Sequence, residues 1–151
     1  MFAAIRPHSI DLAVAVHVFG AIVLVGAVVT AAGAGILGWR DDSATLRRLS
    51  YRTLLIVALP AWIVMFVGAL WSQSKEHLDN LPSDPTWLTI GHIGAEGGGL
   101  LLLISIVLGG IGVRRSDAGG GGGLLKASSM LAAFLVAVYV VAIWAMGGKP
   151  T

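Results

Sequence analysis

The feature that most constrains this chain is a set of four long apolar stretches that carry almost no charge. No charged residue occurs in Leu12–Trp39, in Thr53–Ser74 or in Ala127–Gly148, and the third stretch contains only Glu96. A helix of about 20 apolar residues crosses a hydrocarbon core of roughly 30 Å, so each stretch is long enough to span a bilayer. The predicted spans cover residues 11–38, 53–73, 87–113 and 124–146.

The predicted fold class is all-α, a polytopic membrane protein with four transmembrane helices in an up-down bundle. The sequence is 56% hydrophobic and 12% charged, about half the charged share of a soluble domain. The outer loop over residues 72–86 and the flexible, glycine-rich inner loop over 114–123 are short, so residues 1–151 are expected to form one domain. The first apolar run is too long for a signal peptide. The absence of cysteine excludes disulfides and thiolate metal sites.

The distribution of basic residues predicts the orientation. The two loops on one face of the membrane carry seven Lys and Arg residues, and the other face carries three. By the positive-inside rule the richer face is cytoplasmic, so we expect a multi-pass plasma-membrane protein with both termini on the extracytoplasmic side. The lipid bilayer is then its first partner, and the small net charge of +2 gives no indication of nucleic-acid binding. The seven residues are Arg40, Arg47, Arg48, Arg52, Arg114, Arg115 and Lys126, and the three are Arg6, Lys75 and Lys149.

Three polar side chains inside the spans form the candidate site. His17 in the first span and His92 in the third are expected at about 9 Å and 7 Å below the outer ends of their helices, and Glu96 at about 13 Å. Glu96 follows His92 by four residues, so the two share one helical face. An ionisable side chain inside a membrane helix is costly and by default marks a functional site.

The favoured interpretation is a haem b site for electron transfer. The first and third spans are diagonal in an up-down bundle, so two inward histidines could ligate one haem iron from opposite sides. His17 and His92 are the predicted axial ligands, and Glu96 is their hydrogen-bonding neighbour. Gly20, with Gly91 and Gly94, leaves room for a flat macrocycle, while Met65, Phe66 and Tyr139 lie at a similar depth and are predicted to line the pocket.

Several alternatives stay open at this point. His17, His92 and Glu96 could hold a single metal ion, form a proton or solute pathway, or hydrogen-bond one another only to fix helix register. The chain could also be a non-catalytic accessory subunit of a larger membrane complex, or a homo-oligomer. Rows of small residues that stay exposed to lipid would favour that alternative.

The chain also resembles small, mostly uncharacterised four-helix membrane proteins of actinobacterial type. The resemblance rests on His17 with Gly20 and Gly26 behind it, on the segment Arg52–Trp62, and on the run Leu78–Pro82. More distantly, the chain is similar to the HemJ-type protoporphyrinogen oxidase and to the membrane domain of copper-resistance D proteins. In those proteins a histidine of the first span is paired with a polar residue of a later span. The resemblance implies a haem-associated role for His17, with His92 or Glu96 in place of the third-span lysine of the oxidase.

Overall fold

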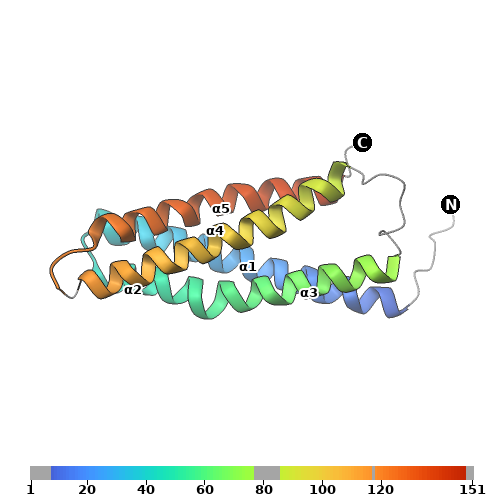
Figure 1. Ribbon diagram of the computed structural model, residues 1–151, viewed down its shortest axis with the longest axis horizontal. Helices are drawn as coiled ribbons and strands as arrows, with labels where there is room; N and C mark the ends of the chain where they lie inside the picture. Colours follow the sequence, from blue (N-terminus) through green and yellow to red (C-terminus); the bar gives the residue numbers. More distant parts are fainter. Residues whose placement is uncertain (1–7, 77–85, 117, 149–151) are drawn as a thin grey trace.

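The computed structural model describes residues 8–76, 86–116 and 118–148, and it is a bundle of four long helical spans that run up and down (Figure 1). All four are long and apolar enough to cross a membrane. Large apolar side chains such as Ile22, Ile56, Leu100 and Phe134 lie exposed on the outside of the bundle, which is the surface that lipid covers. The predicted fold class is confirmed.

The helices are longer than the predicted spans, most of all in the second span, which begins at Ala44 instead of residue 53 and ends at Glu76 instead of residue 73. The outer loop, predicted from residue 72, therefore begins later. Residues 77–85, the rest of that loop, lie outside the described residues. The elements are α1 (His8–Arg40), α2 (Ala44–Thr53), η1 (Leu54–Ala58), α3 (Leu59–Glu76), α4 (Thr86–Ser116) and α5 (Gly122–Gly148).

The second span is one continuous helix made of α2, η1 and α3. It begins at Ser43, whose hydroxyl accepts a hydrogen bond from the backbone N–H of Leu46, as an N-cap residue does. The π-helical turn η1 directly precedes Pro60, and the N–H of Leu59 bonds five residues back to the carbonyl of Leu54. A wider turn relieves the clash between a proline ring and the carbonyl four residues earlier, so the helix passes the proline without ending.

The glycine-rich inner loop is shorter than predicted, because Gly122 and Gly123 belong to α5. Gly119 and Gly121 have φ values of +81° and +86°, a conformation that glycine adopts at little cost. The N–H of Gly120 bonds back to the carbonyl of Arg115 and closes the end of α4.

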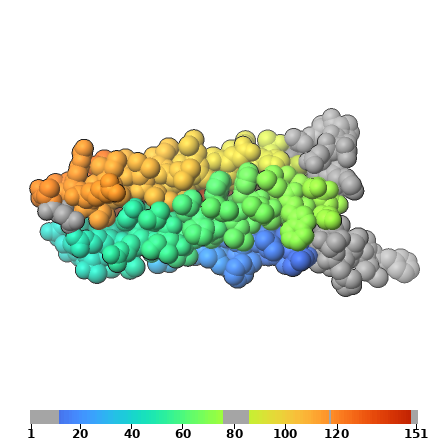
Figure 2. Space-filling model, turned by 60° about the horizontal axis from the view of Figure 1, so that its bottom comes forward, coloured from blue at the N-terminus to red at the C-terminus, as the bar shows by residue number. Residues whose placement is uncertain are grey.

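The bundle consists of two close helix pairs. α1 packs along α3, α4 packs along α5, and α1 also packs against α5. α3 and α4 meet along a looser seam, which Figure 2 shows between the green and the yellow segments. Within the described ranges α1 and α4 have no close backbone approach, so they are diagonal, as the up-down order predicts.

We name the two ends of the bundle after their side chains. The histidine half contains the beginnings of α1 and α4 and the ends of α3 and α5, with His17 and His92. The arginine half contains the opposite ends and the short α2 helix, with Arg47, Arg52 and Arg114. The core between the halves is made of fully buried side chains from all four spans: Leu24, Val28, Leu54, Leu102 and Leu135.

Candidate functional site in the histidine half

His17 lies against α3 and is oriented by that helix. Its backbone packs directly on Gly68, where an added Cβ would lie 2.6 Å from the His17 nitrogen. Its ring Nδ1 lies 2.9 Å from the carbonyl oxygen of Met65. A carbonyl only accepts hydrogen bonds, so Nδ1 donates, and a neutral imidazole in this position leaves its Nε2 lone pair uncommitted.

His92 is bound across the α3–α4 seam. Its Nε2 lies 2.6 Å from the side-chain amide nitrogen of Gln73. A second bridge lies deeper in the seam, where the Trp62 indole N–H donates to the carbonyl of Ala95 at 2.8 Å and the Trp62 ring stacks on Phe66. Long side chains from α3 therefore connect the two helix pairs. Sequence reasoning missed Gln73, although it is a rare amide at the predicted end of the second span.

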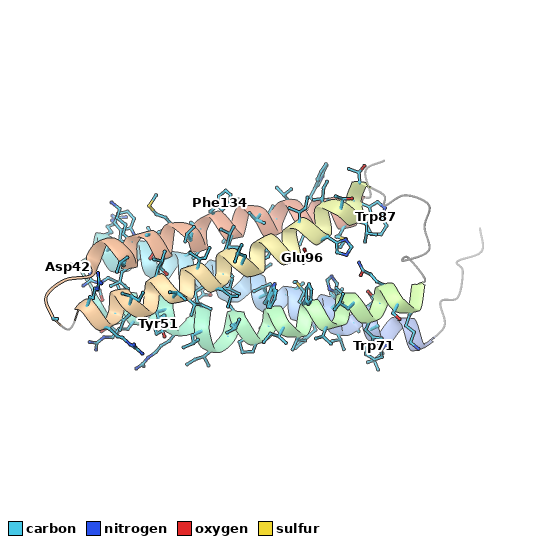
Figure 3. All side chains as sticks on the ribbon, in the orientation of Figure 1. Asp42, Tyr51, Trp71, Trp87, Glu96 and Phe134 are labelled. Carbon is cyan, nitrogen blue, oxygen red and sulfur yellow. The ribbon has the colours of Figure 1, made fainter. Side chains whose placement is uncertain are left out.

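Glu96 lies on the outer surface of α4, not inside the bundle. It is exposed, and no hydrogen bond or ion pair joins it to any other part of the chain that the structure describes. Its neighbours on that surface, Ile93 and Leu100, are 66% and 61% exposed. Figure 3 shows Glu96 on the central part of α4, well inside the end marked by Trp87.

Gly20, Met65 and Tyr139, three of the residues predicted to form the pocket, belong to the packed interior. Gly20 allows α1 to approach α3, because an added Cβ would lie 2.5 Å from the backbone nitrogen of Met65. Met65 itself is buried in the core. Tyr139 is also buried, with its ring against Gly98, and its hydroxyl has no hydrogen-bond partner in the described structure.

The structure does not gather His17, His92 and Glu96 into one cluster. Both histidines contact α3, at Met65 and Gln73, which are eight residues or about 12 Å apart along the helix. The expectation that the three polar side chains hydrogen-bond one another is therefore wrong. Residues 8–76, 86–116 and 118–148 hold no group of three His, Asp or Glu side chains suited to a metal ion, so the three-ligand metal site is not formed there.

The same geometry decides how well a haem would fit. The donor chemistry fits, since His17 and His92 are imidazoles on diagonal helices and the Nε2 of His17 makes no hydrogen bond to the part of the chain that the structure describes. The packing does not fit. The spaces that glycines were predicted to leave for a macrocycle are filled by side chains or backbone of the neighbouring helix. Met65 occupies the space beside Gly20, Met146 that beside Gly91, and Ala142 that beside Gly94.

The arginine half contains a second polar cluster, which the sequence analysis did not single out. Ser105 and Ser128 donate to each other's carbonyl oxygens at 2.9 Å and 2.8 Å, across α4 and α5. Ser50 donates to the carbonyl of Ala31, and Ser129 to that of Leu125. Serines within otherwise apolar spans were the available signal. Every one of these hydroxyls is buried and bonded, so the cluster is suited to holding helices together and not to binding a ligand.

Comparison with known proteins does not assign the chain to a family. No protein-family model, no curated protein and no solved structure matches the chain. The resemblance to the HemJ-type and copper-resistance D groups therefore stays a prediction. What the geometry defines is a small four-span integral membrane protein with one carboxylate on its lipid-facing surface.

Proposed function

We propose that this protein is a subunit of a larger membrane assembly, in which the outer face of α4 packs against another membrane helix. One observation carries the proposal. Glu96 lies among exposed apolar side chains in a membrane-spanning helix and has no partner within the described residues. Ionisable residues in membrane helices almost always face a protein interior or a water-filled cavity, so this surface is one that an assembly would cover.

The depth of Glu96 supports the proposal. It follows Trp87 by nine residues, or about 13 Å along α4. Trp87 lies in the first turn of α4, where a tryptophan side chain marks the membrane interface. A glutamate side chain is too short to reach that level, and a carboxylate near the middle of a membrane helix costs about 2.5–3.5 kcal/mol on insertion scales. A partner that covers Glu96 and bonds to it would offset this cost.

A second surface is consistent with assembly. Gly26, Thr30 and Gly33 lie on the exposed face of α1, and a Cβ added to either glycine would meet nothing within 4 Å. These small residues serve no packing within the described bundle. In lipid such rows allow another helix to approach closely, and their exposure is the outcome that the accessory-subunit alternative requires.

The test is the size of the native complex. In membranes of the native host, the wild-type protein is expected to migrate with a mass above that of one chain after mild solubilisation. Glu96→Ala is expected to shift it toward the monomer, whereas Val67→Ala, at an exposed position of α3 outside both proposed surfaces, is the matched control and should leave the mass unchanged. A wild-type protein that is monomeric in its own membrane, as counted by stepwise photobleaching of a fluorescent label, would refute the proposal.

Haem b binding at His17 is a second candidate, favoured by the Met65 carbonyl that orients its ring, and it would require the side chains that fill the space beside Gly91 and Gly94 to move apart. A haem held there would supply one-electron chemistry. His17 would be the first ligand, and His92 would have to leave Gln73 to become the second. The purified protein should then show a Soret band that is lost in His17→Ala and weakened in His92→Ala. A colourless preparation from haem-supplemented cells would eliminate this candidate.

The orientation is part of the same proposal. Seven basic residues of the arginine half support a cytoplasmic position for that half, with the histidine half toward the outside. Because the chain has no cysteine, a single Ala118→Cys or Thr86→Cys variant can be probed with an impermeant thiol reagent on intact cells. Labelling of Ala118→Cys, and not of Thr86→Cys, would show that the protein has the opposite orientation.

A further inference from the structure

The surface around Glu96 has the form of a helix-docking site. We define the Glu96 face as the part of α4 that carries Ile93, Glu96, Gly97 and Leu100. Ile93 and Leu100 are among the most exposed large side chains of α4. A Cβ added to Gly97 would meet nothing within 4 Å. The face therefore presents two apolar ridges, a flat position between them and one carboxylate, a combination that a helix can pack against closely.

A hollow continues the Glu96 face toward α5. It has a volume of about 310 Å³ and lies between α4 and α5, where Ile93, Gly94, Phe134 and Val141 are among the residues that line it. All eight of its lining residues are apolar or glycine. Figure 3 shows Phe134 on the outer side of α5. Since Ile93 belongs both to the hollow and to the Glu96 face, a helix seated in the hollow would bring its own side chains next to Glu96.

A second copy of this chain is a poor occupant. Around a two-fold axis, Glu96 of one copy would face Glu96 of the other, and like charges repel. The described spans supply no basic residue at that depth, because Leu12–Trp39, Thr53–Ser74 and Ala127–Gly148 are uncharged. Lys75 is a basic residue at the histidine end of α3, but it lies one turn beyond Trp71 and therefore outside the apolar stretch.

We propose that the Glu96 face binds a single membrane helix of a different protein, one that carries a Lys or Arg at the depth of Glu96. This inference rests on the proposed function, since it names the chemistry of the partner in the assembly. A carboxylate with no donor of its own is best matched by a cation, because hydrogen bonds between charged groups are shorter and about twice as strong as neutral ones. In a medium without water, such a pair is also selective against helices that lack the basic residue.

The experiment uses the full chain in phosphatidylcholine vesicles with synthetic single-span peptides as probes. Three Leu/Ala helices are compared, identical except for one position at the depth of Glu96, which is Lys, Asn or Leu. Association is measured by energy transfer between a label on the peptide and one on the protein. The Lys peptide is expected to bind at least about tenfold more tightly than the Leu peptide. That preference should vanish with Glu96→Gln, which keeps the shape and removes the charge.

Two controls keep the outcomes separate. Leu100→Ala changes the shape of the Glu96 face and should weaken all three peptides to a similar extent. Val67→Ala, at an exposed position of α3 outside both proposed surfaces, should change none. Equal binding of the Lys and Leu peptides would overturn the inference, and so would a Lys preference that survives Glu96→Gln. Neither result bears on the size of the native complex, so the proposed function could stand while the basic partner is refuted. Stronger binding of the Asn peptide would indicate a neutral donor and would also refute it.

Discussion

The arginine half and the histidine half differ in how completely the polar side chains of their spans are hydrogen-bonded. In the arginine half the hydroxyls of Ser50, Ser105, Ser128 and Ser129 are all buried and all donate to backbone carbonyls. In the histidine half, Glu96 and the hydroxyl of Tyr139 have no partner within the described residues. Polar groups that only fix helix packing are bonded within the bundle. The unpartnered ones are those whose presence the packing of one chain does not explain.

The largest expected effect tests how tightly the arginine half is packed. A Cβ at Gly35 would overlap the side chain of Ser129 and lie 3.0 Å from the Ser50 hydroxyl, so Gly35→Ala is expected to lower the free energy of unfolding by about 1–3 kcal/mol. The matched control is Gly33→Ala, two residues away on the open face, which should be neutral or raise stability by up to about 1 kcal/mol. Thermal unfolding in detergent measures both. Equal effects would mean that the arginine half is not closely packed.

A second, smaller effect of opposite sign is expected in the histidine half. Tyr139→Phe removes a buried hydroxyl that has no partner and keeps the ring against Gly98. Leaving a polar group buried without a hydrogen bond costs about 1–3 kcal/mol, so the variant should be stabilised by roughly 1 kcal/mol. Chemical unfolding of the two proteins in the same detergent gives the difference. Destabilisation would show that the hydroxyl has a partner and would weaken the contrast between the halves.

The smallest expected change in unfolding free energy comes from comparing one hydrogen-bonded pair of side chains in each half. Side-chain hydrogen bonds between membrane helices average about 0.6 kcal/mol and reach about 1.7 kcal/mol in double-mutant cycles. In the Ser105–Ser128 pair each hydroxyl donates to the other residue's backbone carbonyl, so Ser105→Ala and Ser128→Ala each remove one bond. The summed loss of unfolding free energy in these two variants should exceed the loss in Gln73→Ala, which removes the single bond to His92. A larger loss in Gln73→Ala would place the firmer polar contact in the histidine half.

The spans themselves were predictable because charge is excluded from hydrocarbon. Uncharged runs such as Leu12–Trp39 fix the number of helices, and the up-down order then makes α1 and α4 diagonal. The start of the second span was predicted too late, at residue 53, although Ser43 has the chemistry of an N-cap and caps α2 in the structure. The number of helices and their up-down order depend on local composition and on chain order alone.

The rotation of each helix was not predictable, and it decides the site. A membrane helix has apolar residues on its lipid face as well as on its buried face, so periodicity does not reveal which side points inward. His92 and Glu96 share one helical face in the sequence, yet His92 reaches Gln73 on α3 while Glu96 lies exposed. Turning a helix about its axis by one residue position, about 100°, is enough to move a side chain from the interior of the bundle to its lipid-facing surface.

The pairing of α1 with α3 and of α4 with α5 has a consequence for biogenesis. Each pair is a helical hairpin made of consecutive spans, so the first pair can enter the membrane as a unit before the second is synthesised. The chain is thus divisible between residues 76 and 86, and two separately expressed fragments should find each other through the α1–α5 contact. Such a divided protein would let labels or isotopes be placed in one hairpin alone.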